Sequence, residues 1–319
     1  MVPKDVRACA EVIANHPVLG PRYQGRALAD LSAAWLRVLG SESIVGAVFE
    51  ESEGSRFVFR GFGISVFVTD DFMWQVKKPP LVWSGFELAT RILQGRSPVL
   101  SERQLREANS KEGLNLIVWE AIPQTGFEKR ADIYHLMVTS FIEVHRGYRL
   151  KEMITSPVES VERLQWALDA GGLLWNPSAG RYDRCPERKY RDLVNQPHVI
   201  GVTRDAEFAR PGTWVGTLFD YHPPKFGFSR SEQAMLWRAL DGGTDASLSK
   251  ELGVSLPTVK KMWLSVYRRM GDHIPELNHD SSPADATAIR RGKEKKRHLL
   301  AYLRNHPEEL RPVSQNLLR

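Results

Sequence analysis

Residues 249–263 read SKELGVSLPTVKKMW, and this stretch decides how the C-terminal part of the chain folds. Helix-favouring residues run up to Leu252, and Gly253-Val254-Ser255 then interrupts them before a second helical pattern begins. Gly253 stands where a helix ends with a residue at positive φ, a conformation that glycine adopts without steric cost. Ser255 can cap the next helix, and Pro257 is tolerated in a first turn, whose amides have no intrahelical partner. The stretch predicts two helices joined by a three-residue turn.

A third helix is predicted immediately before this pair. Ser229 and Glu232 have the spacing of a capping box, and Gly242-Gly243 ends the apolar pattern that follows them. Thr244 can cap the short helix that runs to Leu252. Apolar residues of the first helix fall on one face: Met235, Leu236, Ala239 and Leu240.

The last of the three helices has two chemically different faces. Its apolar residues follow a 4-3-4 spacing at Val259, Trp263, Val266 and Met270. Its polar side carries Lys261, Ser265 and Arg268, with Thr258 and Lys260 on the flanks. Four basic residues and no acidic residue occur between positions 255 and 270. A basic amphipathic helix set on another helix by a short turn is helix-turn-helix geometry, in which the second helix enters the DNA major groove.

The region 228–271 resembles the C-terminal DNA-binding domain of LuxR-type regulators. The resemblance rests on four gap-free matches: Ser229-Arg230-Ser231-Glu232, Gly242 to Asp245, Leu252-Gly253-Val254-Ser255 with Thr258-Val259-Lys260, and Val266-Tyr267-Arg268-Arg269-Met270-Gly271. Three positions depart from the family pattern. Ala246-Ser247 replaces a Lys-Glu pair, and Met262 replaces a His, so the operator contacts are expected to differ while the fold is kept.

The resemblance implies a set of DNA-binding residues, namely Ser255, Pro257, Thr258, Lys260, Lys261, Lys250, Thr244, Arg268 and Arg269. Thr258 and Lys260 would contact the backbone or base edges, whereas Lys250, Arg268 and Arg269 would contact phosphates. The expected partner is double-stranded DNA, bound by a homodimer across two half-sites about 34 Å apart. RNA polymerase is a further partner to consider. Two alternatives stay open: a helical interaction module with a solvated basic face, and a protein like region 4 of a sigma factor.

The charge of the chain is uneven. Net charge is +6, and residues 225–319 hold 17 basic and 11 acidic side chains, so residues 1–224 are neutral overall. This asymmetry favours a polyanionic partner for the C-terminal part. No apolar run is long enough to span a bilayer, and the N-terminus lacks the apolar segment of a secretion signal. Cys9 and Cys185 form no motif, so we expect a cytoplasmic protein with reduced thiols and no membrane partner.

Two loop-like segments divide the chain. Residues 220–229 (DYHPPKFGFS) read as a linker, and residues 272–288 read as an exposed loop. The predicted domains are 1–222, 226–272, and 273–319, the last being a loop plus a basic C-terminal helix. RRGKEKKR at 290–297 leads into Leu299, Leu300 and Leu303, which predicts either a docked, solvated helix or an additional phosphate-binding arm.

The first 222 residues mix both kinds of secondary structure. Strand-like composition marks 43–51, 57–68, 114–122, 172–176 and 213–221, and helical spacing marks 22–38, 86–93, 101–109, 130–145 and 157–170. Helices flanking a largely antiparallel sheet predict an α/β (α+β) sandwich, for which we take a GAF- or PAS-like sensor as the model. The C-terminal part is predicted to be all-α.

The N-terminal domain is predicted to sense a signal or to dimerise. Most of its seven tryptophans are expected in the core, with some lining a pocket for a small-molecule effector. Asp70-Asp71 is read as a solvated strand end, and His145 as a helix-end histidine. No phosphate loop, nucleophile elbow or metal-ligand spacing is present, so we expect no enzyme, catalytic residue, cofactor or metal. An acyltransferase-like domain fused to a regulator is the enzymatic alternative.

Overall fold

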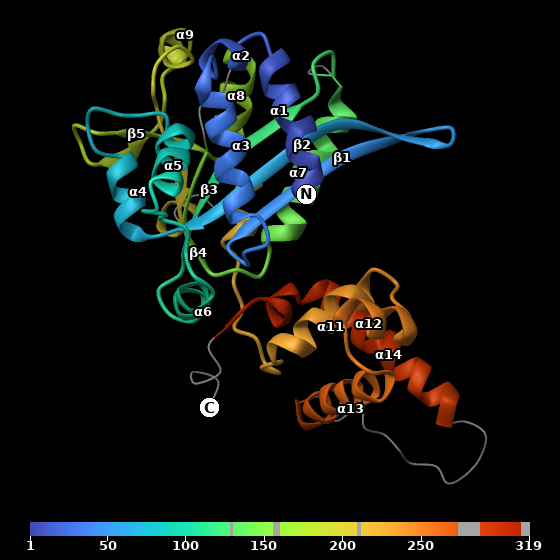
Figure 1. Cartoon of the computed structure of the whole chain (residues 1–319). Helices are drawn as coiled ribbons and strands as arrows, with labels where there is room; N and C mark the ends of the chain where they lie inside the picture. Colours follow the sequence, from blue (N-terminus) through green and yellow to red (C-terminus); the bar gives the residue numbers. More distant parts are fainter. Residues whose placement is uncertain (128–129, 156–159, 209–211, 274–287, 314–319) are drawn as a thin grey trace. The chain divides into compact units, whose positions relative to one another are not determined.

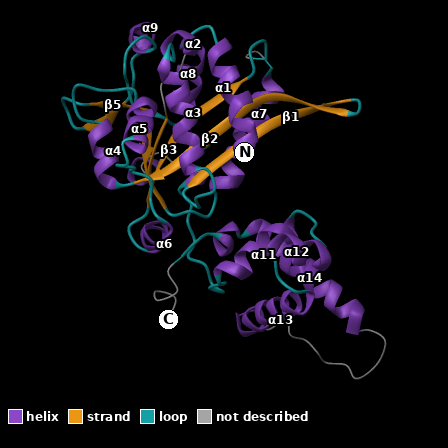
Figure 2. Cartoon of the chain, in the orientation of Figure 1, coloured by secondary structure: helices purple, strands orange, loops and turns teal. Residues whose placement is uncertain are grey.

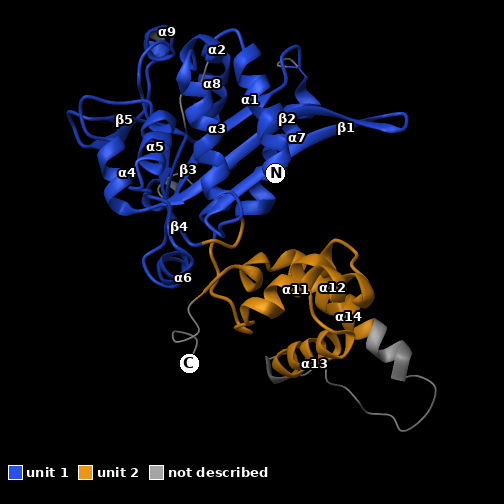
Figure 3. Ribbon diagram, in the orientation of Figure 1, with its two compact units in different colours: residues 1–145, 149–220 blue, residues 146–148, 221–319 orange. Residues whose placement is uncertain are grey.

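The computed structural model describes residues 1–127, 130–155, 160–208, 212–273 and 288–313. The chain forms two compact units, coloured separately in Figure 3. Unit 1 comprises Met1–His145 and Arg149–Asp220, and unit 2 comprises Arg146–Tyr148 and Tyr221–Arg319. Among the described residues, no helix combines the length and the apolar character needed to cross a bilayer.

Unit 1 is built on a seven-stranded sheet (Figure 2). Its strands are β1 (Ile44–Glu53), β2 (Arg56–Val68), β3 (Leu114–Pro123), β4 (Leu150–Thr155), β5 (Leu173–Asn176), β6 (Arg181–Asp183) and β7 (Ile200–Thr203). Their order is β1-β2-β3-β4-β7-β5-β6, and every neighbouring pair is antiparallel except β3–β4. The prediction of a mixed α/β unit with a largely antiparallel sheet is confirmed.

Helices of unit 1 lie on both faces of this sheet (Figure 1). They are α1 (Val6–Asn15), α2 (Leu19–Arg22), α3 (Arg26–Val38), α4 (Asp70–Val76), α5 (Ser84–Leu93), α6 (Glu102–Ser110), α7 (Ala131–His145), α8 (Val161–Asp169), α9 (Tyr190–Leu193) and α10 (Arg204–Phe208). Short 3-10 turns are η1 (Pro3–Asp5), η2 (Glu187–Lys189) and η3 (Val215–Leu218).

Alternate side chains along β2 point to opposite faces of the sheet, and the two sets differ in size. Phe62, Ile64 and Val66 point into the main core, where they pack with α1, α3, α4 and α5. Gly63 and Ser65 point to the opposite face and line a cavity beneath α7. On β2, large apolar side chains therefore face the main core, and the small residues Gly63 and Ser65 face the cavity.

Three local predictions for unit 1 were wrong. Residues 213–221 do not form a strand, because Val215, Leu218 and Phe219 have helical spacing and are buried together along η3. The predicted helix 22–38 is divided into α2 and α3 by Gly25, whose φ is +62°. Asp70-Asp71 opens α4 after the capping residue Thr69, so it is a helix start. The start of the predicted helix 157–170 lies outside the described residues.

The tryptophans of unit 1 are also less buried than predicted. Trp35 and Trp119 are fully buried in the core, but Trp74, Trp166 and Trp214 are exposed. Trp166 and Trp214 line the cavity, which explains why they are not packed in the core.

Unit 2 contains α11 (Arg230–Leu240), α12 (Asp245–Leu252), α13 (Leu256–His273), α14 (Ala288–Asn305) and η5 (Pro307–Leu310). The predicted apolar stripe of α13 is confirmed, since all four of its side chains are buried: Val259, Trp263, Val266 and Met270. They pack with Met235 and Leu236 of α11 and with Leu299 and Leu303 of α14. The capping box of Ser229 and Glu232 is present as predicted.

The last described helix belongs to the core of unit 2. Leu299 and Leu303 of α14 are buried there, and Leu300 packs against them. Lys296 pairs with Asp245 at 3.2 Å, and its ammonium group lies 4.6 Å from the centre of the Trp263 ring. The indole N–H of Trp263 donates to the same carboxylate at 3.1 Å. These contacts support a docked helix; the side chains of residues 290–293 lie outside the described residues.

Candidate nucleic-acid interface and ligand cavity

The turn between α12 and α13 has the geometry that its sequence predicts. Gly253 adopts φ +65° and ψ +29°, and its N–H donates to the Lys250 carbonyl at 3.3 Å. The Val254 N–H donates to the Ser249 carbonyl at 3.1 Å. A Cβ atom at Gly253 would meet nothing within 4 Å, so glycine is required by backbone conformation and not by lack of space.

Hydroxyl groups cap the two helices that the turn joins. The Thr258 N–H donates to Ser255 Oγ at 3.3 Å, and the Ser255 and Thr258 hydroxyls lie 2.9 Å apart. Thr244 Oγ1 accepts the Ser247 N–H at 3.2 Å and caps α12. The caps fix the two ends of the helix pair, and Ser255, Pro257, Thr258 and Thr244 are all exposed there.

Four of the predicted DNA-binding side chains are unpaired cations. Lys250, Lys260, Lys261 and Arg268 are exposed, and none has a hydrogen-bond or ion-pair partner within the part of the chain that the structure describes. Lys261 and Arg268 lie on the side of α13 that faces away from its buried stripe, and Lys260 lies on the flank of that side. This leaves concentrated positive charge on a helix whose other side is rigidly packed.

Arg269 differs from the other predicted cations. Its guanidinium donates to the Gly227 carbonyl at 2.5 Å and lies 3.7 Å from the Glu232 carboxylate, which belongs to the capping box of α11. Arg269 therefore holds the C-terminal half of α13 against the start of α11. It is not part of the unpaired group.

Unit 1 contains a cavity of about 620 Å³ between one sheet face and helices α7 and α8. Ala47, Gly63 and Val118 line its sheet side, and Met137 and Phe141 line its helix side. The cavity exists because small residues on the strands leave space beneath α7. Trp166 and Trp214, which are exposed to solvent, also line it.

Two buried polar contacts involve residues of the cavity wall, Ser65 and His145 in one and Glu120 in the other. Ser65 Oγ lies 2.7 Å from His145 Nε2, and His145 Nδ1 lies 2.7 Å from the Phe141 carbonyl. The carbonyl can only accept, so Nδ1 of His145 carries a proton. The Tyr23 hydroxyl donates to Glu120 at 2.5 Å. Burial and the Glu120 carboxylate raise the pKa of Tyr23 well above its ordinary value, which keeps the hydroxyl protonated.

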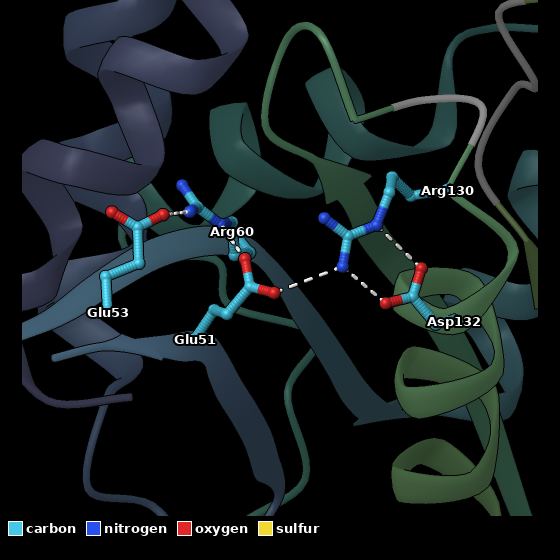
Figure 4. A network of polar contacts seen from close by, with 5 residues as sticks. All are labelled: Glu51, Glu53, Arg60, Arg130 and Asp132. Atoms are coloured by element: carbon cyan, nitrogen blue, oxygen red, sulfur yellow. Dashed lines mark hydrogen bonds and ion pairs between the residues drawn. The ribbon is translucent and has the colours of Figure 1, made fainter.

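A charged network fixes the start of α7 over the sheet (Figure 4). Arg60 of β2 pairs with Glu51 at 2.7 Å and also contacts Glu53. Arg130 contacts Glu51 at 3.1 Å and Asp132 at 2.5 Å. Its hydrogen bonds lower the pKa of Asp132 to about 2, and those of Arg60 and Arg130 lower the pKa of Glu51. Both carboxylates stay ionised at neutral pH, so these ion pairs hold the start of α7, the helix that covers the cavity, against β1 and β2.

The cavity lining could be found from the sequence only in part. The alternation in FVFRGFGISVFV (57–68) places the glycines and Ser65 on one face, which is a signal for a thinly packed sheet face. A helix over residues 130–145 was predicted, and Met137, Phe141 and Val144 of this helix line the cavity. His145 was predicted as a helix-end residue, but its partner Ser65, 80 residues away, has no local signal.

Comparisons with known proteins give no relative, since no family model, no curated protein and no solved structure matches this chain.

Proposed function

We propose that the chain is a DNA-binding transcription regulator whose LuxR-type helix-turn-helix places α13 in the major groove of double-stranded DNA. The unpaired cations on the outer side of α13, Lys260, Lys261 and Arg268, carry this proposal. Uncompensated positive charge on a rigid helix suits phosphates, whose contacts supply most of the affinity in such complexes. Arg269, which is engaged within unit 2, is assigned to positioning the helix.

The residues at the start of α13 and in α12 also support placing α13 in the major groove. Base edges are read by the N-terminal part of a recognition helix, and Ser255, Pro257 and Thr258 are exposed at the start of α13. Thr244 caps α12 and Lys250 lies within it. In a helix-turn-helix this first helix of the pair crosses the phosphate backbone. A homodimer would present two such helices to two half-sites.

The cavity supports an effector-sensing role for unit 1. Small-molecule sites in proteins have volumes of about 300–1,000 Å³ and are mostly apolar with a few polar groups. The cavity of about 620 Å³, with Ser65, His145 and Glu120 in its wall, fits that description. A domain that only dimerises would not need this space. The GAF- or PAS-like assignment and contact with RNA polymerase stay predictions.

Two alternatives are weaker on the same evidence. The Ser65–His145 pair resembles part of a catalytic triad, but the structure places the Phe141 carbonyl at His145 Nδ1, where a triad has a carboxylate. A sigma-like role would require a second functional region, and no sequence feature of one is found upstream.

The test is fluorescence anisotropy of the full chain on a random-sequence duplex over a range of salt concentrations. Comparison of wild type with Lys260→Ala/Lys261→Ala should show weaker binding. Because each lost phosphate contact lowers the slope of log K against log salt by about 0.9, the double variant should lower it by about 2 for each bound helix.

The matched control is Lys4→Ala/Lys78→Ala, which removes the same charge from exposed positions of unit 1. It should retain the wild-type slope. If the α13 variant binds with the wild-type affinity and slope, or if the wild type does not bind DNA, α13 is not the DNA-binding element.

A further inference from the structure

Leu264 is an apolar side chain among the exposed cations of α13. It is 68% exposed, which is the highest exposure of any large apolar side chain among the described residues of this unit. A single exposed leucine is common on protein surfaces, so the groups around Leu264 decide what its exposure indicates.

The neighbours of Leu264 on the helix surface are cations. Lys260 and Lys261 precede it by four and three residues, and Arg268 follows it by four, so all three flank it on one face. All three are exposed, whereas the buried stripe through Trp263 and Val266 lies on the opposite side. Leu264 is therefore the apolar centre of a positively charged surface.

The charge around Leu264 indicates what covers it. Protein interfaces are depleted in lysine at their centre, so three cations around one leucine suit a polyanion better than a protein. The major groove of DNA offers one apolar group between its phosphates, the C5-methyl of thymine. Apolar side chains on recognition helices contact this methyl, and no other base of unmodified DNA carries it.

We propose that Leu264 is a specificity-determining residue that packs against a thymine methyl in the major groove. The inference rests on the proposed DNA-binding function and deepens it, because it names the base that α13 selects at this position. Lys260, Lys261 and Arg268 hold the helix by phosphate contacts that carry no sequence information, and Leu264 supplies sequence preference.

The experiment uses the full chain and DNA that differs only in the methyl group. Duplexes with a random central segment are selected for binding, and the enriched pool is amplified either with dTTP or with dUTP. Deoxyuridine keeps every hydrogen-bonding group of thymine and lacks the methyl. Dissociation constants on both pools are measured for the wild type, Leu264→Ala and Leu36→Ala, a control at an exposed leucine of α3 in unit 1.

The wild type should bind the deoxyuridine pool about fourfold more weakly for each half-site, as expected for the loss of one buried methyl, and about 15-fold more weakly as a dimer. Leu264→Ala should bind both pools equally, while Leu36→Ala should discriminate like the wild type. The salt dependence of Leu264→Ala should stay unchanged, because no charge is removed. A thermal melt checks folding, which truncation of an exposed side chain should not alter.

Equal wild-type binding to both pools would overturn the proposal, as would discrimination that survives in Leu264→Ala. If the wild type discriminates and Leu264→Ala loses affinity equally for both pools, Leu264 acts on the helix and does not read the methyl. These failures leave the salt titration of the lysine variants intact. Absence of DNA binding by the wild type in that titration would instead remove the proposed function itself.

Discussion

Replacement of Gly253 by alanine should loosen the helix pair without any steric clash. At φ +65° an L-residue pays about 1–2 kcal/mol of backbone strain. Alanine recovers part of this, about 0.4–1 kcal/mol, because it restricts the unfolded chain. No atom lies within 4 Å of the new Cβ, so no steric clash or new packing contact changes the free energy of unfolding further. The net loss should be about 1 kcal/mol, confined to unit 2.

Hydrogen exchange followed by mass spectrometry measures this loss locally, which matters because a chain of two units need not unfold in one step. A change of about 1 kcal/mol should speed exchange in α12 and α13 by about fivefold. Gly253→Asn should show a smaller effect, because asparagine tolerates this conformation. Gly54→Ala has the same strain at φ +64° and open space in unit 1, so it should leave α12 and α13 unchanged. Wild-type exchange in Gly253→Ala, or equal damage from asparagine, would refute the reasoning.

Two further predictions concern buried groups and the cavity. Glu309 is 1% exposed and accepts the N–H groups of Lys225 and Phe226, and burial raises its pKa above the ordinary 4.5. Its stabilising contribution is therefore complete below about pH 4.5 and is lost as pH rises through the raised folded-state value. The melting temperature of unit 2 in the wild type should fall relative to Glu309→Gln as the pH rises above about 4.5, and a constant difference would contradict this. A metabolite that binds in the cavity should stabilise the wild type against thermal unfolding by about 2.7 kcal/mol at 100 times its Kd. Ser140 lines the cavity, so Ser140→Trp should fill the space and abolish this stabilisation. Thr139→Trp changes a residue of the same helix that does not line the cavity, so it should retain the stabilisation.

The helix boundaries and the buried face of α13 in unit 2 could be predicted from local sequence signals. The caps at Ser229, Thr244 and Ser255, the left-handed Gly253 and the buried stripe of α13 all depend on residues within a few positions of one another. The prediction for 213–221 failed because β-branched composition and helical spacing compete in a short segment, and burial of Val215 and Leu218 decides between them. The exact role of Arg269 was equally hidden, since its partner Gly227 lies 42 residues away.

The sequence by itself determined the two helices joined by a short turn at Gly253, the basic face of α13 and the mixed composition of unit 1. These properties follow from the periodicity of side chains and from the conformations that glycine, proline and capping residues prefer. Only the tertiary structure decided the strand order, the cavity beneath α7, the Ser65–His145 pair and the exposure of Leu264. Each of these depends on which distant segments pack together, because burial and pairing are properties of contacts between elements and not of any one element.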